Sequence, residues 1–336
     1  MNAAYLEIDN QFIEEGIIMG RKTTCLLLSA ACLLTVLALP LLSSQDEKVR
    51  VEEKKPVIGI AWQKYLGETY YATCQAIEAA GGMPVLLGQV FSADLSYDDN
   101  GMLKDAKDAD GALTPEAAKP VRCNTWQSSN ADTVMEGISA VVFTGGSNVS
   151  PSLYYTPEPV KSVESYNAER DVSDYILMSY CLEHDIPVLG LCRGMQILSI
   201  VSGAEMIQDI PDYMVSIGKS YAYEHRNEPE EPGAYRDFAL HDVTVTDGNS
   251  ILYRLTGMKT IHAVPSWHHQ AVKSVEGTRL KVSGFTETNG LELIEAVERT
   301  DKGFALGLQY HPEIAVVREM DEVSLSYFEA LVNLAG

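Results

Sequence analysis

Short apolar blocks recur along the middle of the chain, separated by longer stretches of mixed polarity. Blocks of this length predict buried strands, and the longer stretches between several of them predict helices. Because the first elements alternate between strand and helix, they favour a parallel sheet. The predicted strands are 56–61, 83–87, 138–143 and 187–191, and the predicted helices are 69–80, 169–184 and 193–201.

The last third of the chain is richer in strands and ends in a helix. We therefore expect one α/β domain over residues 56–336, a flavodoxin-like three-layer sandwich around a mostly parallel central sheet. No second domain is needed to account for these elements. The predicted strands of this part are 242–245, 280–283, 293–297 and 305–309, followed by a helix at about 316–334.

Two segments do not fit this succession of strands and helices. Residues 92–127 are rich in Asp, Ala, Lys, Gly and Pro and have no strong period, so we interpret them as a surface insertion or lid. Residues 46–55 are mostly charged and predict a solvated linker. The folded domain is therefore expected to begin at residue 56.

Residues 1–45 have the character of a targeting leader. A short basic start at residues 19–22 precedes an uncharged stretch at residues 23–45, and this order resembles the basic and apolar parts of a signal peptide. Residues 1–18 carry four acidic side chains, which suit export poorly. We therefore place the start of translation at Met19.

The apolar part of the leader leaves two outcomes open. As a helix, the 18 residues from Cys25 to Leu42 would reach about 27 Å, close to the roughly 30 Å of a bilayer core. We favour a cleaved signal peptide over an uncleaved membrane anchor formed by residues 23–45. Either outcome places the rest of the chain outside the cytoplasmic membrane, in the periplasm or the extracellular space.

The chain is acidic, with a formal net charge of −22. Such a surface repels phosphate backbones, so nucleic acid is an unsuitable partner, whereas a homodimer stays open. Exported proteins form disulfides, and Cys74 and Cys123 are the pair to test first. No C-x-x-C pattern and no histidine pair with zincin spacing occurs in the sequence, so we expect neither a metal site nor a cofactor.

The run G-L-C-R-G at residues 190–194 places a cysteine where a predicted strand meets a predicted helix. It matches the nucleophile-elbow pattern, with Cys192 in the serine position. At a helix N-terminus the dipole and the free N–H groups favour a thiolate, and the N–H of Arg193 can face a developing oxyanion. By itself the pattern also fits a buried structural cysteine, but the strand before it and the helix after it favour a nucleophile.

The run Q-Y-H-P-E at residues 309–313 supplies a candidate base. Side chains two apart on a strand point to the same side, so Glu313 can bond to the imidazole of His311 and orient it. A third run, F-T-G-G-S-N-V-S-P at residues 143–151, leads from a buried strand into two glycines, and such a loop can aim an N–H at a reacting carbonyl. Taken singly, H-P-E also fits a surface histidine, and the glycine pair also fits an ordinary tight turn.

Together these runs resemble the class I glutamine amidotransferase-like superfamily, and within its peptidase branch the γ-glutamyl-γ-aminobutyrate hydrolases. The resemblance covers about residues 56–315 and also includes Leu153-Tyr154, Arg170-Asp171, His225-Arg226 and the run S-W-H-H-Q at 266–270. It implies a catalytic triad of Cys192, His311 and Glu313, an oxyanion hole from the N–H groups of Gly146 and Arg193, and a role for Gln196 in holding a glutamyl group.

Two further residues are candidates for binding the substrate. His268 lies outside the implied triad, and it either contacts the substrate or has a hydrogen-bonded structural role near the pocket. Arg170 either meets a substrate carboxylate or forms a salt bridge with Asp174, four residues further on. The sequence does not decide between these roles.

The motifs and the resemblance lead to one expected reaction. Cys192 attacks the amide carbon of a small γ-glutamyl compound, His311 protonates the leaving amine, and water hydrolyses the resulting thioester. Two alternatives stay open: a glutaminase subunit that releases ammonia from glutamine for a synthetase, and a non-catalytic binding protein of the same fold. Export favours the hydrolase, because synthetases that receive ammonia need nucleotides and cytoplasmic partners.

Overall fold

The computed structural model describes residues 55–156, 166–222, 224–227 and 237–336. The predicted leader at residues 1–45, and all of the predicted linker except Lys55, lie outside the described residues. Within the described ranges, none of the helices combines the length and the apolar character that a membrane span requires.

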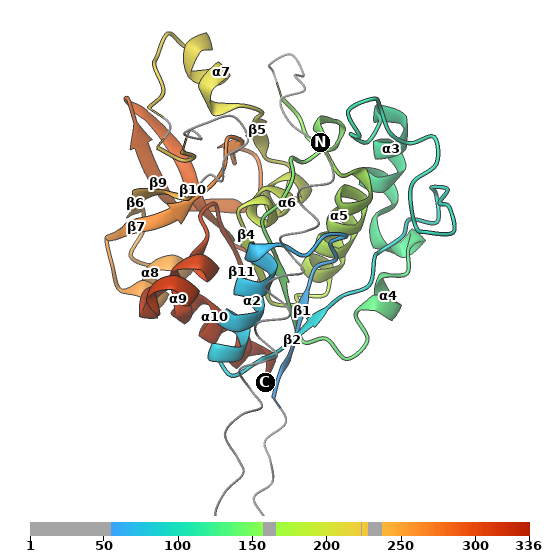
Figure 1. The fold of residues 1–336 in the computed structure, drawn as a ribbon, viewed down its shortest axis with the longest axis horizontal. Coiled ribbons are helices and arrows are strands. Elements are labelled where there is room, and N and C mark those ends of the chain that lie inside the picture. The colour runs from blue at the N-terminus through green and yellow to red at the C-terminus, as the bar shows by residue number, and fades with distance from the viewer. Residues whose placement is uncertain (1–54, 157–165, 223, 228–236) are drawn as a thin grey trace, which may run out of the picture. The chain divides into compact units, whose positions relative to one another are not determined.

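The described chain is built around one 11-stranded sheet (Figure 1). The strands are β1 (Val57–Ile60), β2 (Met83–Leu86), β3 (Ala140–Phe143), β4 (Val188–Leu191), β5 (Glu205–Ile207), β6 (Ala239–Val245), β7 (Thr260–Ser266), β8 (Ala271–Ser274), β9 (Leu280–Thr288), β10 (Leu291–Arg299) and β11 (Ala305–Leu308). The central strands run parallel in the order β2-β1-β3-β4-β11, which is the flavodoxin-like order. Antiparallel strands continue the sheet as β10-β9-β6-β7, while β8 pairs with β10 and β5.

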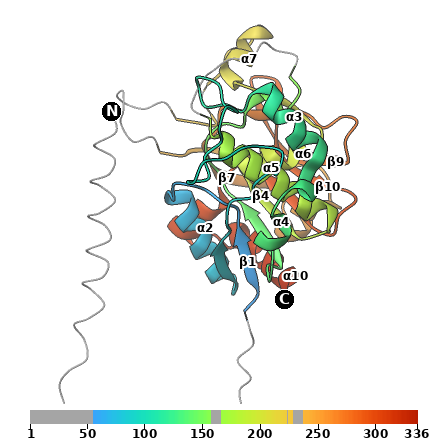
Figure 2. The same ribbon diagram turned by 90° about the vertical axis from the view of Figure 1, so that its right-hand side faces the viewer.

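Helices cover both faces of the sheet (Figure 2), which confirms the predicted three layers. They are α2 (Glu68–Ala79), α3 (Pro115–Asn124), α4 (Ala131–Val134), α5 (Ala168–Glu183), α6 (Arg193–Val201), α7 (Ile210–Ser216), α8 (Ile251–Thr256), α9 (Pro312–Glu319) and α10 (Glu322–Ala335), with the short 3-10 helices η1 (Thr125–Ser128) and η2 (Pro151–Leu153). Buried side chains of α3, α5 and α6 form one core with Val141 and Phe143, whereas those of α2, α8 and α10 form another with Ala140 and Val142. The division follows from the strand, in which alternate side chains point to opposite faces.

The predicted elements are confirmed up to the end of α6, which has the predicted bounds. The single helix predicted at about 316–334 is wrong in its extent, because Met320, with a φ of 53°, separates α9 from α10. The sequence also misses β5, β7 and β8, and the Pro265 and polar positions of β7 do not resemble a strand. β7 lies at the edge of the sheet, where proline is tolerated because one side of the strand makes no ladder bonds.

Residues 92–127 are only partly a surface feature. They contain two tight turns, in which the carboxylates of Asp98 and Asp108 each accept two backbone N–H groups. Between and after these turns, Leu103, Leu113 and Val121 are buried in the core that α5 and α6 share. Leu103 and Leu113 follow the two turns ten residues apart, a spacing that is neither the helix period nor the strand period, so the sequence conceals the contribution of this segment to the core.

The four cysteines of the described chain are all free. Cys74, on α2, packs against the core on one face of the sheet, whereas Cys123 lies on α3, which packs against the other face. The pairing of Cys74 with Cys123 is therefore wrong, because the sheet separates the two helices.

Candidate active site

Three of the runs singled out in the sequence meet at one edge of the sheet. Cys192 follows β4, the pair Gly145-Gly146 follows β3, and His311 lies shortly after β11. Because β3, β4 and β11 are neighbouring parallel strands, their carboxyl ends lie together, at the edge where open α/β sheets bind ligands. The N–H of Cys192 donates to the carbonyl of Leu308 at 2.7 Å, which ties the end of β4 to the end of β11.

The turn from β4 into α6 is tight and holds Cys192 in a strained conformation. Its φ of 50° and ψ of −104° lie outside the regions that L-residues favour. Both flanking glycines are required by close packing. A Cβ at Gly194 would stand 2.1 Å from the carbonyl oxygen of Phe143, and one at Gly190 would stand 2.7 Å from the carbonyl carbon of Gly194. This packing sets the thiol at the N-terminus of α6.

His311 and Glu313 are in contact, but not through the predicted strand geometry. β11 ends at Leu308, and His311 is the cap of α9, whose first residue is Pro312. The Nδ1–H of His311 donates to the carboxylate of Glu313 at 2.7 Å across the first turn of that helix. The shared strand face is therefore wrong, whereas the contact itself is confirmed. Since a carboxylate only accepts, it leaves Nε2 of the neutral ring as the acceptor.

The thiol, the imidazole and the carboxylate are buried and electrostatically coupled. Cys192 is 5% exposed, His311 3% and Glu313 0%. Burial alone would lower the pKa of His311, but the charges of Glu313 and Cys192 outweigh it and raise that pKa to about 10. His311 and Cys192 both lie beside Gly145. A Cβ on that glycine would stand 2.7 Å from Cε1 of His311, so the approach of the loop depends on glycine there.

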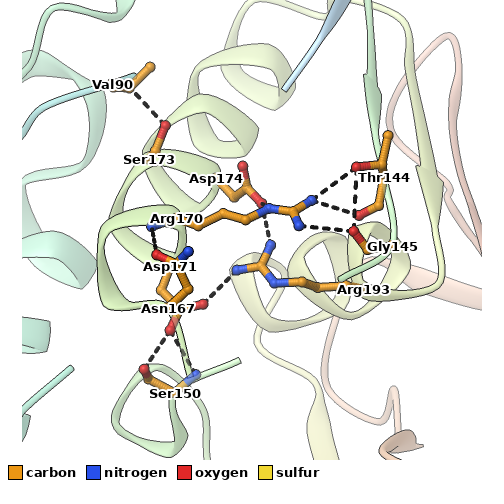
Figure 3. A network of polar contacts seen from close by, with 10 residues as sticks. All are labelled: Val90, Thr144, Gly145, Ser150, Asn167, Arg170, Asp171, Ser173, Asp174 and Arg193. Carbon is orange, nitrogen blue, oxygen red and sulfur yellow. Dashed lines mark hydrogen bonds and ion pairs between the residues drawn. The ribbon is translucent and has the colours of Figure 1, made fainter. Parts of the chain in front are cut away.

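A buried ionic network lies directly behind the elbow (Figure 3). Arg193, the residue after Cys192, pairs with Asp171 at 2.5 Å and also with Asp174. Asp171 accepts from the backbone N–H of Ser150 at 3.0 Å as well. Because both carboxylates belong to α5, the network joins the first turn of α6 to α5 and to the segment after the glycine loop.

Arg170 belongs to the same network and holds the glycine loop. Its guanidinium donates to the carbonyl oxygens of Gly145 and Thr144, at 2.9 and 3.0 Å. It also fills the side of Gly146 where a side chain would stand, since a Cβ there would lie 2.1 Å from Nη1. Of the two predicted roles, the salt bridge with Asp174 is confirmed, at 3.3 Å. Arg170 thus acts on the loop, and it does not line the cavity beside the thiol.

A cavity of about 90 Å³ opens beside Cys192. Its lining is mostly polar and includes Gly146, Arg193, Gln196, Arg226 and His268. A space of this size accepts a small polar group, not a folded partner. The cavity therefore brings together both proposed oxyanion donors, the thiol and the glutamine singled out in the sequence.

The sequence pattern of the Peptidase C26 family matches residues 117–313, more than half of the chain, including Cys192, His311 and Glu313. The chain belongs to this family. The predicted resemblance to the peptidase branch of the class I glutamine amidotransferase-like superfamily is thereby confirmed.

Three comparisons show how near its relatives are. NtpR of Enterococcus hirae is 29% identical over 240 residues, which cover 71% of this chain and 90% of NtpR. The γ-glutamyl-γ-aminobutyrate hydrolase PuuD of Escherichia coli K12 is 31% identical over 169 residues, which cover 50% of this chain and 60% of PuuD. Among solved structures, that of PurLQS from Thermotoga maritima is similar with a TM-score of 0.48 and 15% identity, covering 83% of this chain and 99% of that chain.

Several cavity residues of this Peptidase C26 chain were not assigned from the sequence. The carbonyl of Trp267 lies 3.8 Å from Sγ of Cys192. His269 contacts Asn148 at 2.9 Å and Asp209 at 3.0 Å, so it links the glycine loop to the start of α7. The run S-W-H-H-Q contained the signal, but its spacing did not tell which side chains reach the cavity.

His268 lines the cavity, yet both of its ring nitrogens face protein groups. Nδ1 donates to the carbonyl of Gln270 at 2.9 Å, and Nε2 lies 3.6 Å from the carboxylate of Glu295. Of the two predicted roles, the hydrogen-bonded structural one is confirmed. His268 is also one of three histidines around Glu295, a cluster that spacing along the sequence did not reveal.

Proposed function

We propose that this Peptidase C26 member is a cysteine hydrolase that cleaves the γ-glutamyl amide bond of small γ-glutamyl compounds. One observation carries the proposal: Cys192, on a strained turn at a helix N-terminus, lies beside His311, which Glu313 holds at 2.7 Å. This is the arrangement of nucleophile, base and orienting carboxylate that covalent acyl transfer requires. The relative PuuD, named as a γ-glutamyl-γ-aminobutyrate hydrolase, supports the choice of bond.

The proposed reaction has two halves. The thiolate of Cys192 attacks the amide carbon, and the N–H groups of Gly146 and Arg193 stabilise the oxyanion. His311 donates its proton to the leaving amine as the carbon–nitrogen bond breaks, which leaves a thioester. His311 then removes a proton from water, which attacks the thioester, and glutamate leaves while the thiolate is restored.

The polar cavity supports a glutamyl group as the part that is recognised. Arg226 lines it and supplies a cation for the substrate carboxylate. The amide nitrogen of Gln196 donates to the carbonyl of Gln270 at 3.3 Å and to the side-chain oxygen of Gln309 at 3.4 Å. Because its nitrogen is engaged, Gln196 presents its carbonyl oxygen as an acceptor for the substrate ammonium group.

The linkage and the leaving group are tested by a comparison of three substrates. We expect kcat/KM to be highest for γ-glutamyl-γ-aminobutyrate, lower for glutamine, and lower again by about 100-fold or more for an α-glutamyl dipeptide. The last loss follows because a displacement of about 1 Å from the oxyanion donors costs roughly that factor. The Cys192→Ser protein is the matched control and should turn over none of them.

Each outcome separates the candidate functions. A clear preference for glutamine would replace the hydrolase by the glutaminase. Equal rates on the two linkages would remove the γ-glutamyl specificity, and unchanged activity in Cys192→Ser would remove the nucleophile itself.

A further inference from the structure

Three histidines and a glutamate converge in the antiparallel half of the sheet, next to the cavity. His225 precedes β6, His241 lies on β6, His268 follows β7, and Glu295 lies on β10. One nitrogen of each ring and one carboxylate oxygen all lie within 4.8 Å of one another. The Nε2 atoms of His225, His241 and His268 stand 3.4, 3.7 and 3.6 Å from the nearer oxygens of Glu295.

The atoms that face one another in this cluster are buried without hydrogen-bond partners. The side chain of His241 is 7% exposed, and His225 and Glu295 are wholly buried. All three Nε2 atoms and both oxygens of Glu295 lack a hydrogen bond. A buried polar group without a partner is costly, and a buried charge more so. A single ligand that contacts these five atoms together would remove this cost.

In each of the three histidines, Nδ1 contacts a group outside the cluster, while Nε2 faces Glu295. Nδ1 of His268 donates to a backbone carbonyl at 2.9 Å, and Nδ1 of His241 contacts the carbonyl of Asp242 at 3.3 Å. Nδ1 of His225 contacts the hydroxyl of Tyr221 at 3.1 Å. For His268 and His241 the carbonyl partner requires Nδ1 to donate, which leaves Nε2 of a neutral ring unprotonated, and a carbonyl contact of this kind is one that metal-binding histidines usually make.

We propose that His225, His241, His268 and Glu295 form a binding site for one divalent transition-metal ion, with Zn²⁺ as the ion that fits best. Imidazole and carboxylate are ligands of this metal, and four protein ligands complete the tetrahedral shell of a closed, structural site. Ligands about 2.0–2.1 Å from zinc stand about 3.3–3.4 Å apart in a tetrahedron. The distances of 3.4 to 3.7 Å to Glu295 therefore need to shorten by a few tenths of an ångström, and the wider pairs, which lie within 4.8 Å, need to close further around the ion.

The donors and acceptors of the cluster agree with a cation. A neutral ring whose Nδ1 donates offers Nε2 as an acceptor, and a carboxylate ion offers only acceptors. A divalent ion satisfies all of them at once, whereas a single proton satisfies one pair.

The metal would fasten one wall of the cavity to the sheet. His268 lines the cavity, and its neighbour Trp267 contacts the nucleophile through its carbonyl. The ion would therefore set the position of this wall while taking no part in the reaction. The site is independent of the reaction proposed for Cys192, so either proposal can fail without the other.

Metal content of the full chain is the direct test. We expect the protein, purified without a histidine tag and dialysed against Zn²⁺, to retain about one ion per chain by elemental mass spectrometry. Removal with a chelator should lower the Tm, and Zn²⁺ should restore it. Co²⁺ added to the metal-free protein should give the visible absorption of tetrahedral cobalt. A wild-type protein that retains no zinc and gives no such spectrum overturns the site, whatever the variants do.

Two variants and a control assign the ligands. His241→Gln and Glu295→Gln should each weaken zinc binding by at least about 100-fold, because even changes to outer contacts of metal ligands cost 10–100-fold. His262→Gln, on the neighbouring strand, should bind zinc as the wild type does, since His262 is exposed and pairs with Asp242 outside the cluster. Undiminished zinc binding by folded His241→Gln and Glu295→Gln would place the ion elsewhere and overturn the assignment.

Discussion

Glu313 is the residue whose replacement tests the proposed triad most directly. It is fully buried, and its carboxylate accepts from Nδ1 of His311. In Glu313→Gln the side chain keeps its size but loses its charge, so the imidazolium loses its counter-ion. We expect kcat to fall by about 10²–10⁴-fold, the usual contribution of general acid–base catalysis, with a smaller change in KM. Steady-state kinetics on the best γ-glutamyl substrate measures both.

The same variant should respond differently to pH. The pKa of His311 is raised from 6.5 to about 10, so the charged ring stabilises the fold fully below pH 6.5, and this contribution is lost as the pH rises to about 10. Urea unfolding measured between pH 6.5 and about 10 should show that the free energy of unfolding depends less on pH in Glu313→Gln than in the wild type. Glu319→Gln, exposed at the end of the same helix, is the control and should behave as the wild type. If the free energy of unfolding depended on pH in Glu313→Gln as it does in the wild type, the electrostatic coupling between Glu313 and His311 would be contradicted.

Gly194 tests the packing that strains the elbow. A Cβ there would stand 2.1 Å from the carbonyl oxygen of Phe143, so either β3 or α6 must move. We expect Gly194→Ala to lower the free energy of unfolding by about 1–3 kcal/mol, the usual cost of overpacking, and to lower kcat as well. Gly248→Ala is the control, because a Cβ there meets nothing within 4 Å. Equal free energies of unfolding in the two variants would show that the turn at Cys192 accommodates the added methyl group without loss of stability.

At the scale of elements, the ionic network decides how α5, α6 and the glycine loop fit together. Arg193 pairs with both Asp171 and Asp174, and burial raises the pKa of Asp171 despite this partner. In Arg193→Met these carboxylates lose their main cation, and breaking a buried pair in this way costs about 3–5 kcal/mol. Chemical denaturation should show this loss. The backbone N–H of residue 193 remains, so a folded variant should keep part of its activity.

An exposed ion pair provides the comparison for that experiment. Arg279 pairs with Asp301 at 2.9 Å, but its side chain is 72% exposed, so Arg279→Met should change stability little. If Arg193→Met were equally harmless, the network would contribute nothing to the junction of α5 and α6, and the position of the elbow would depend on apolar packing alone.

At the scale of the whole molecule, we predict that residues 23–45 direct export. Their uncharged run follows a basic start, the order that a signal peptide requires. Cell fractionation should find the protein outside the cytoplasmic membrane, and N-terminal sequencing should show whether the leader is removed. A variant lacking residues 23–45 should stay in the cytoplasm. Finding the intact full chain soluble in the cytoplasm would contradict export and strengthen the glutaminase alternative.

The parallel half of the sheet and the turn that carries Cys192 could be predicted from the sequence because their signals are local. Strands β3 and β4 are continuous apolar runs, as strands buried on both faces must be. The elbow is equally local, since the turn needs glycine on both sides of Cys192. The antiparallel strands were predicted less completely, because their half-exposed residues mix polar and apolar positions and Pro265 hides one of them.

Contacts between distant segments were decided only by the tertiary structure. The sequence named His311 and Glu313 as partners, but the start of a helix brings them together, not a strand. The sequence left Arg170 with either a substrate carboxylate or Asp174 as its partner, and in the structure Arg170 pairs with the buried Asp174. Spacing along the chain did not reveal the histidine cluster, because His225 and Glu295 converge from segments seventy residues apart. Local patterns determine which elements form, and only the packing of the sheet determines which polar side chains are buried against one another.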